Sequence, residues 1–375
     1  MLTGIRPAKI ASGLLGRGFS AEETQEELRS YYLVDAAKAK LCVDVVRAQI
    51  PIVAASPPNA ISIYIGIPFC PSVCHYCSFS GYPAGRYRKQ IGSYVAALIK
   101  EIEYLATACR DKHVENIYIG GGTPTVLGDE DFEQLLCAVA ASFPVDNLLE
   151  YTIEAGRPDT ITRQKLAIMK RHDVSRISIN PQTLHDRTLE KIGRGHSVAD
   201  FFKAYEMAQS EGFVNINVDL ILGLPNETPE DVRGTLYGIA ALGPKSCTIH
   251  TLAVKRASKF HEVGMLTHAE VAQMQEMLAL SVEHMADLGL APYYMYRQKN
   301  SCGNFENVGY AAPDFEGRYN IQMMEETHSI YAAGAGAVTK LVDVEQGRIE
   351  RIFNLRNPVE YMEKVDEMIA RKINL

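Results

Sequence analysis

The chain has 375 residues, of which 47% are hydrophobic and 22% are charged, and these proportions are typical of a soluble globular protein. Its formal net charge of −7 argues against a nucleic-acid-binding protein, which would present a basic face. No run approaches the roughly 18 apolar residues of a membrane span, and no apolar signal segment follows the first residues, so we expect a cytoplasmic protein.

The first 55 residues predict an N-terminal helical segment. Residues 20–34 and 36–50 have the spacing of helices, and two or three helices fit before residue 55. The sequence ASPPNA at 55–60 predicts a linker into the next part of the chain.

Short runs rich in β-branched residues then recur, and helical patterns separate them. The six runs are ISIYIGI (61–67), NIYIG (116–120), YTIEA (151–155), RISIN (176–180), INVDLIL (216–222) and TIHTLA (248–253). This alternation predicts an α/β fold with a parallel sheet covered by helices. Six units suit a partial (β/α)6 TIM-like barrel over residues 56–265, although a doubly wound sheet has the same alternation.

The alternation stops near residue 265. Residues 268–289 predict a long helix with apolar side chains near positions 271, 274, 278, 282 and 285, and we interpret its methionines as core residues. YYMYRQ at 293–298 resembles a strand, and residues 357–373 predict a final helix. We therefore expect residues 266–375 to form a mostly helical C-terminal domain that covers the active site.

Three of the eight cysteines lie within eight positions, in PFCPSVCHYCSF at 68–79: Cys70, Cys74 and Cys77. The C-x3-C-x2-C spacing differs from the paired C-x2-C ligands of zinc sites, and no fourth Cys or His follows at a suitable distance. Soft thiolates on one loop are typical of an iron–sulfur cluster, and three ligands on a four-iron cluster leave one iron open for a substrate. Zinc and three reduced thiols remain the alternatives.

The other five cysteines are scattered along the chain. Several lie in apolar segments such as QLLCAVA at 134–140, where a buried free thiol is the usual state. A disulfide framework is not expected in a long chain without an export signal.

Polar residues follow the other predicted strands. The second strand runs into GGGTPT at 120–125, which lacks the Lys-Ser/Thr pair of a phosphate-binding P-loop. Glu154, Gln182, Arg194 and Asp219 lie in or after the next three strands. Each alone can be an ordinary structural polar group, but together they predict a shared pocket at one end of the sheet.

These motifs resemble a known group of enzymes. CPSVCHYC, with an aromatic residue before the third cysteine, and GGGTPT resemble the radical S-adenosylmethionine (SAM) superfamily. YIGIPFC, RISINPQTLHDRTLEKIGRGH and VDLILGLPNET are similar to the oxygen-independent coproporphyrinogen III oxidase (dehydrogenase) family. GIRPAKI near the start and residues 296–311 most resemble its HemZ-type branch, and the resemblance covers nearly the whole chain.

The resemblance implies roles for particular residues. Cys70, Cys74 and Cys77 would hold a 4Fe–4S cluster whose open iron binds SAM, and Tyr76 would lie against the adenine. The other residues implied in SAM binding, by one molecule or by two, are Tyr64, Gly121, Gly122, Thr123, Glu154, Gln182, Arg194, Asp219, Ala253 and Val338. Glu154 would bind the ribose, and Gln182, Arg194 and Asp219 match contacts to a second SAM.

The resemblance also implies a reaction. Reductive cleavage of SAM would give a 5′-deoxyadenosyl radical that oxidatively decarboxylates two propionates of coproporphyrinogen III to vinyl groups, giving protoporphyrinogen IX. An electron donor such as a flavodoxin or ferredoxin would reduce the cluster. The substrate propionates need cationic partners, for which the candidates are Arg157, Lys255, Arg256 and Arg297, each equally able to be an ordinary ion-pair residue. The alternatives are a radical SAM enzyme that modifies or degrades haem, and a haem-binding carrier.

Three positions depart from the family pattern. Phe79 stands where the dehydrogenases have a fourth cysteine, and Gly66 stands where many relatives have histidine. Related haem chaperones carry H-N-x-x-Y-W, whereas residues 306–311 here read ENVGYA, so Glu306 and Ala311 replace the histidine and tryptophan.

Overall fold

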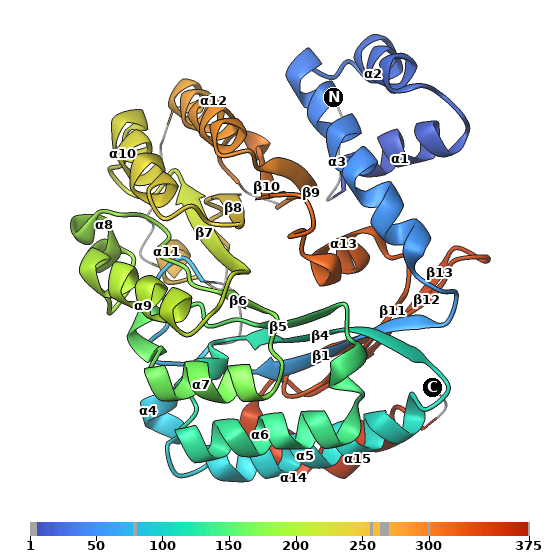
Figure 1. Ribbon diagram of the computed structural model, residues 1–375, viewed down its shortest axis with the longest axis vertical. Coiled ribbons are helices and arrows are strands. Elements are labelled where there is room, and N and C mark those ends of the chain that lie inside the picture. Colours follow the sequence, from blue (N-terminus) through green and yellow to red (C-terminus); the bar gives the residue numbers. More distant parts are fainter. Residues whose placement is uncertain (1–5, 78–80, 256–257, 263–269, 299–300, 374–375) are drawn as a thin grey trace.

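A computed structural model of the protein describes residues 6–77, 81–255, 258–262, 270–298 and 301–373 (Figure 1). Its centre is six parallel strands that are neighbours in chain order: β1 (Ala60–Ile67), β4 (His113–Gly121), β5 (Glu150–Ile153), β6 (Arg176–Ser178), β7 (Ile216–Leu222) and β8 (Ser246–Thr251). Each predicted run contributes one strand. A doubly wound sheet would reverse its strand order, and this order has no reversal, so the prediction of a partial (β/α)6 barrel is confirmed.

Helices and short turns connect these strands. The helices are α5 (Ile91–Ala108), α6 (Asp129–Ser142), α7 (Arg163–Arg171), α8 (Asp186–Lys191), α9 (Val198–Ser210) and α10 (Pro229–Ala240). The shorter elements are β2 (Phe69–Cys70), β3 (Tyr82–Pro83), α4 (Ala84–Tyr87), η1 (Pro124–Val126), η2 (Val145–Asn147) and η3 (Pro158–Thr160). Capping boxes at Ser197 and Thr228 start α9 and α10, because each side chain accepts a hydrogen bond from the backbone three residues later.

Three helices precede the barrel, as the sequence predicts: α1 (Ala8–Gly16), α2 (Ala21–Ser30) and α3 (Ala36–Ala55). The linker that follows α3 spans 56–59. α3 packs against β9 (Ala291–Arg297), where Ile52 joins Tyr293 and Tyr294 in a small buried cluster.

The chain after β8 adds strands as well as helices. Its elements are α11 (Lys259–Glu262), α12 (Val271–Asp287), β9, η4 (Cys302–Asn304), β10 (Glu306–Ala311), α13 (Arg318–Glu325), β11 (Ser329–Ala333), β12 (Val338–Asp343), β13 (Arg348–Phe353), α14 (Pro358–Glu363) and α15 (Val365–Ala370). The sheet order is β13-β12-β11-β1-β4-β5-β6-β7-β8-β10-β9, with β11 parallel to β1 and the other added strands antiparallel. The sequence suggested a strand only for β9, so the structure adds β10 to β13 to the expected helices. The expected boundary at residue 265 lies outside the described residues.

Two local expectations are corrected. Cys137 is exposed, because Phe132, Leu135, Leu136 and Val139 form the buried face of α6 and residue 137 lies on the other side. In α12 the methionines at 274, 277 and 285 are buried as expected, but Val271 and Val282 are about half exposed.

The barrel brings the carboxyl ends of its strands to one edge, where parallel α/β folds hold their active sites. Among the described residues, no helix combines the length and the apolar character needed to cross a membrane.

Candidate functional site

The cysteine motif forms a loop that other segments hold in place. Cys70 ends β2, and Cys74 and Cys77 follow it. The His75 amide donates to the carbonyl of Ile192 over 2.9 Å, and the His75 carbonyl accepts from the Phe260 amide over 2.9 Å. The loop is therefore fixed by the segment after α8 and by α11.

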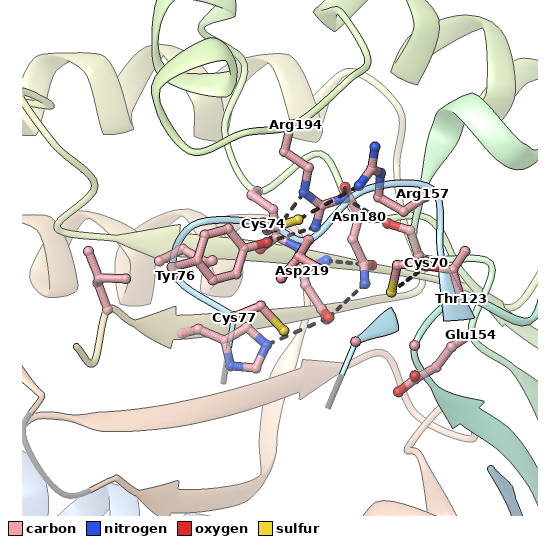
Figure 2. A pocket seen from close by; sticks show the side chains of 18 of the residues that line it. Cys70, Cys74, Tyr76, Cys77, Thr123, Glu154, Arg157, Asn180, Arg194 and Asp219 are labelled. Carbon is pink, nitrogen blue, oxygen red and sulfur yellow. Dashed lines mark hydrogen bonds and ion pairs between the residues drawn. The ribbon is translucent and has the colours of Figure 1, made fainter. Parts of the chain in front are cut away.

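The three thiols line one cavity of about 250 Å³ at the carboxyl edge of the barrel. Figure 2 shows the three cysteines around this space together with Glu154 and Asp219. In the described part of the chain, no three side chains of the Cys, His, Asp and Glu types converge on one metal position. A single zinc ion would need such convergence, whereas thiolates that bind different irons of one cluster would not.

Donors and cations surround two of the thiols. The hydroxyl of Thr123 donates to Cys70 Sγ over 3.6 Å, and the guanidinium of Arg157 donates to Cys74 Sγ over 3.8 Å. Burial raises the pKa of Cys70, while the Thr123 hydrogen bond and the nearby arginines oppose this rise. Hydrogen bonds and positive charge of this kind stabilise a deprotonated sulfur, and at Cys70 they offset only part of the rise that burial causes in the pKa.

The glycine motif lies directly on the start of the cysteine loop. The Gly122 amide donates to Ile67 O over 2.6 Å, and the Thr123 amide donates to Phe69 O over 2.7 Å. A Cβ on Gly122 would collide with the Phe69 carbonyl, and Gly121 has a φ of +105°. Glycine is thus required for this close approach, and Gly121, Gly122 and Thr123 all line the cavity.

Glu154 directly follows β5, and its carboxylate contacts the glycine motif. Its carboxylate accepts hydrogen bonds from the Tyr118 hydroxyl and, over 3.1 Å, from the Gly121 amide. Burial raises the pKa of Glu154, and these two hydrogen bonds oppose the rise. Tyr64 stacks on Tyr118 with ring centroids 6.2 Å apart. Tyr64 does not line the cavity itself, and its role here is to pack against Tyr118, which binds Glu154.

Tyr76 and Arg194 are joined across the cavity. Arg194 donates to the Tyr76 hydroxyl over 2.9 Å through Nη2 and over 3.3 Å through Nε. Its Nη1 donates to the carbonyls of Gly156 and Asn180 over 3.0 and 3.4 Å. The cysteine loop is therefore tied to the ends of β5 and β6.

Asp219 of β7 has polar neighbours that the sequence analysis did not identify: Asn180, Asn217 and His250. Asp219 accepts from Asn217 over 2.7 Å and from Asn180 over 2.9 Å, and its Oδ2 lies 3.6 Å from His250 Nε2. Burial raises the pKa of Asp219, but the neighbouring His250 and Asn217 outweigh this and leave the pKa below its ordinary value. The signal for these missed residues was their place within the fourth, fifth and sixth predicted strands.

Gln182 presents a polar atom without a protein partner. It adopts a φ of +69° and pairs with β7 through the backbone, since its amide donates to Asp219 O over 3.1 Å. Its side-chain Oε1 is buried and has no hydrogen-bond partner among the described residues, although Gln182 lines the cavity. A buried polar atom of this kind is suited to a ligand.

The structure brings most of the other candidate residues to the cavity and leaves some away from it. Ala253, Lys255 and Arg157 line it, but Arg157 is buried and forms an ion pair with Asp159 over 2.8 Å. Val338 begins β12 outside this cavity, and Arg297 lines a second cavity beside α3. Arg256 and Phe79 lie outside the described residues.

The ENVGYA stretch forms β10, and its polar residues have structural partners. Asn307 accepts from the Thr251 amide over 2.7 Å, and Glu306 forms an ion pair with Lys38 over 3.2 Å. Tyr310 is buried in the core. The two positions that match the haem chaperones are thus explained by sheet packing.

The residues of this cavity fit an iron–sulfur cluster and a polar ligand beside it. Three thiols share one wall, cationic groups lie near them, and Gln182 offers an unpaired acceptor. Glycines let the backbone of the 120–123 turn pack directly against the residues that precede Cys70.

Comparisons with known proteins agree with this chemistry. The model of the radical SAM superfamily matches residues 64–236. The chain is 41% identical to the oxygen-independent coproporphyrinogen-III oxidase-like protein HemZ of Bacillus subtilis, over 100% of this chain and 76% of that protein. It is 31% identical to the heme chaperone HemW of Bacillus subtilis, over 74% of this chain and 70% of that protein.

A solved structure shares the fold. The coproporphyrinogen III oxidase HemN of Escherichia coli superposes with a TM-score of 0.66 and 23% identity, over 86% of this chain and 73% of that chain. The chain therefore belongs to the radical SAM superfamily, within the family of HemN- and HemZ-type proteins.

Proposed function

We propose that the protein is an oxygen-sensitive oxidoreductase of porphyrin biosynthesis, which oxidatively decarboxylates the propionates of coproporphyrinogen III to vinyl groups. The observation that carries this proposal is the cavity that combines Cys70, Cys74 and Cys77 with the glycine motif and Glu154. The names of the relatives point to a tetrapyrrole. The chemistry belongs to residues 56–265 in this proposal, and residues 266–375 cover the site.

Membership of the radical SAM superfamily implies a 4Fe–4S cluster and SAM. When bound, they supply one-electron chemistry that removes a hydrogen atom from an unactivated carbon. We assign the cluster to the three cysteines, the adenine to the face of Tyr76, and the methionine and ribose parts of SAM to Gly121–Thr123 and Glu154. We propose one SAM here, and Gln182, Arg194 and Asp219 define where a second would bind.

The chain's own residues would orient these ligands. Arg194 fixes the Tyr76 ring through its hydroxyl, and the Tyr118 hydrogen bond orients Glu154. Lys255 lines the cavity and is the cation that we propose for a substrate carboxylate. For each vinyl group formed, the substrate would lose carbon dioxide, one hydrogen atom, which the adenosyl part of SAM would take up, and one electron, which a separate one-electron acceptor would take up. An electron donor such as a flavodoxin or ferredoxin in the cytoplasm would reduce the cluster.

Anaerobic incubation of the reconstituted protein with dithionite, SAM and coproporphyrinogen III tests the proposal. We expect a product mass lower by one or two oxidative decarboxylations. C74A should abolish turnover, whereas C109A, which changes a buried cysteine outside the cavity, should keep it. SAM cleavage without this mass change would show that coproporphyrinogen III is not the substrate. Loss of haem when haem replaces coproporphyrinogen III in the assay would support haem modification instead.

The second candidate, a haem-binding carrier, is favoured by the 31% identity to HemW. Stoichiometric haem binding together with no SAM cleavage would decide for it.

A further inference from the structure

A network of buried polar groups lies outside the cavity, between the C-terminal helices and β1. Its centre is Glu101 of α5, whose side chain is completely buried and forms an ion pair with the equally buried Lys372. Glu101 also accepts hydrogen bonds from the Gly334 amide (2.8 Å), the Asn354 side chain (2.8 Å) and the Tyr361 hydroxyl (2.6 Å). A buried charge with this many partners favours one arrangement of the segments that supply them.

Lys372 connects the end of the chain to the sheet. It follows α15, and its ammonium donates to the Ala332 carbonyl of β11 over 2.7 Å and to Asn354 Oδ1 over 3.1 Å. Figure 1 shows α14 and α15 beside α5, and both helices contact it. The C-terminal helices are therefore held against α5 and β11, and β11 pairs with β1.

Tyr94, two turns before Glu101 on α5, extends the network to the cysteine loop. Its hydroxyl donates to the Gly66 carbonyl over 2.7 Å and accepts from the Ala335 amide over 2.9 Å. Its ring packs edge-on against Phe69 with centroids 5.1 Å apart. Gly66 and Phe69 are the first and last residues of the 66–69 segment, which directly precedes Cys70.

The same segment carries the contacts of the glycine motif. The carbonyls of Ile67 and Phe69 accept from the Gly122 and Thr123 amides, and Thr123 donates to Cys70 Sγ. On the other side, Gly334 has a φ of +106°, and a Cβ there would collide with the Gly66 carbonyl. A shift of the 66–69 segment would thus move a thiol and the glycine motif together.

We propose that Tyr94 of α5 is a positioning residue that fixes residues 66–69 and through them Cys70 and the glycine motif. This inference rests on the proposed cluster at the three cysteines. It assigns to α5, which does not line the cavity, control over how firmly the cluster is held.

Tyr94→Phe and Tyr361→Phe form a matched pair for the test. Both tyrosines are completely buried, and their rings lie 5.4 Å apart. Both hydroxyls belong to the network, but only that of Tyr94 contacts the end of β1. We expect the two variants to lose thermal stability to a similar extent. Only Y94F should release iron to a chelator about tenfold faster and change the electron paramagnetic resonance spectrum of the reduced cluster.

A second measurement needs no cluster. In the apoprotein, the Gly122 and Thr123 amides should exchange hydrogen faster in Y94F than in Y361F, because their acceptors lie in the 66–69 segment. Should Y94F fail to fold, Phe69→Leu, which removes the ring contacts with Tyr94 and Tyr87 but keeps the Tyr94 hydroxyl, replaces it with the same expectations.

The outcomes separate this inference from the proposed function. Equal iron release, spectra and amide exchange in the two variants would overturn the positioning role and leave a purely stabilising network. A wild-type protein that binds no iron would instead overturn the proposed cluster, and amide exchange would still decide whether Tyr94 fixes the segment.

Discussion

Arg194 joins three segments of the cavity wall through its own hydrogen bonds. It contacts Tyr76 in the cysteine loop, Gly156 after β5 and Asn180 after β6. The order of strands and motifs predicted that Arg194 would lie near the shared pocket. It did not predict that the guanidinium would be bound by protein groups, because the register of loops is set by tertiary contacts.

His196, two residues after Arg194, gives a prediction for the pH dependence of stability. Burial, together with the positive charge of Arg194, lowers the pKa of His196 to about 4. The unfolded chain therefore binds more protons than the folded protein between about pH 6.5 and pH 4, so stability falls as the pH falls through this window. From pH 7 to pH 5 the loss in unfolding free energy should be about 2 kcal/mol from this group.

His328 provides a matched second site far from the cavity. Burial lowers its pKa to about 4 as well, and Glu115 Oε2, at 3.9 Å from Nδ1, is too far for a hydrogen bond. Urea unfolding at pH 7 and pH 5 should show that H196Q and H328Q each remove a similar part of the pH dependence. If the unfolding free energy of H196Q changed with pH as much as that of the wild type, His196 would not be held neutral in the folded protein.

At the level of elements, helix α13 supports the cavity from inside the barrel. Its Tyr319 stacks on Tyr118 with ring centroids 4.4 Å apart, and Tyr118 in turn donates to Glu154. Tyr319 is buried and does not line the cavity itself. The helix therefore sets the position of a cavity carboxylate through two stacked rings.

Tyr319→Ala should weaken SAM binding as well as stability. The cavity left under Tyr118 costs about 3–5 kcal/mol of unfolding free energy and lets the Tyr118 ring move away from Glu154. Ile321→Ala removes a buried side chain from the same helix, but one that packs with Tyr293 and Tyr294. Equilibrium dialysis should show a raised SAM dissociation constant for Y319A alone, and equal values in both variants would contradict the role of the stack.

The sequence predicted the barrel strands better than the added ones for a physical reason. Strands buried on both faces are continuous runs of β-branched residues, as in Ala60–Ile67 and Ile216–Leu222. β12 and β13 are antiparallel strands at one end of the sheet with polar residues between apolar ones. β13 is the edge strand, and four of its six residues are exposed. Short alternating segments of this kind can be predicted as strands only when the strand that pairs with them is known. Val338, a residue placed by resemblance alone, lies at the start of β12 and away from the cavity.

At the scale of the whole molecule, one sheet unites segments from across the chain. α3 packs on β9 at one edge, and Lys372 is bound to β11 near the other. The cavity draws on both halves, since Cys70 follows β1 and Tyr296 comes from β9. Occupation of the cavity should therefore stabilise the protein as a whole.

This coupling gives the last prediction, the stabilisation of the protein by SAM. A ligand that binds only the folded state adds about 2.7 kcal/mol at a hundred times its dissociation constant, so SAM should raise the anaerobic thermal midpoint of the reconstituted protein. The shift in thermal midpoint is measured instead of a free energy of unfolding, because a protein that carries a cluster does not unfold in a two-state transition. The C70A/C74A/C77A variant should show no shift if SAM needs the open iron, whereas C109A should keep it. An equal shift in the triple variant would mean that the glycine motif, Glu154 and Tyr76 hold SAM without the cluster, and the thiols would then need another explanation.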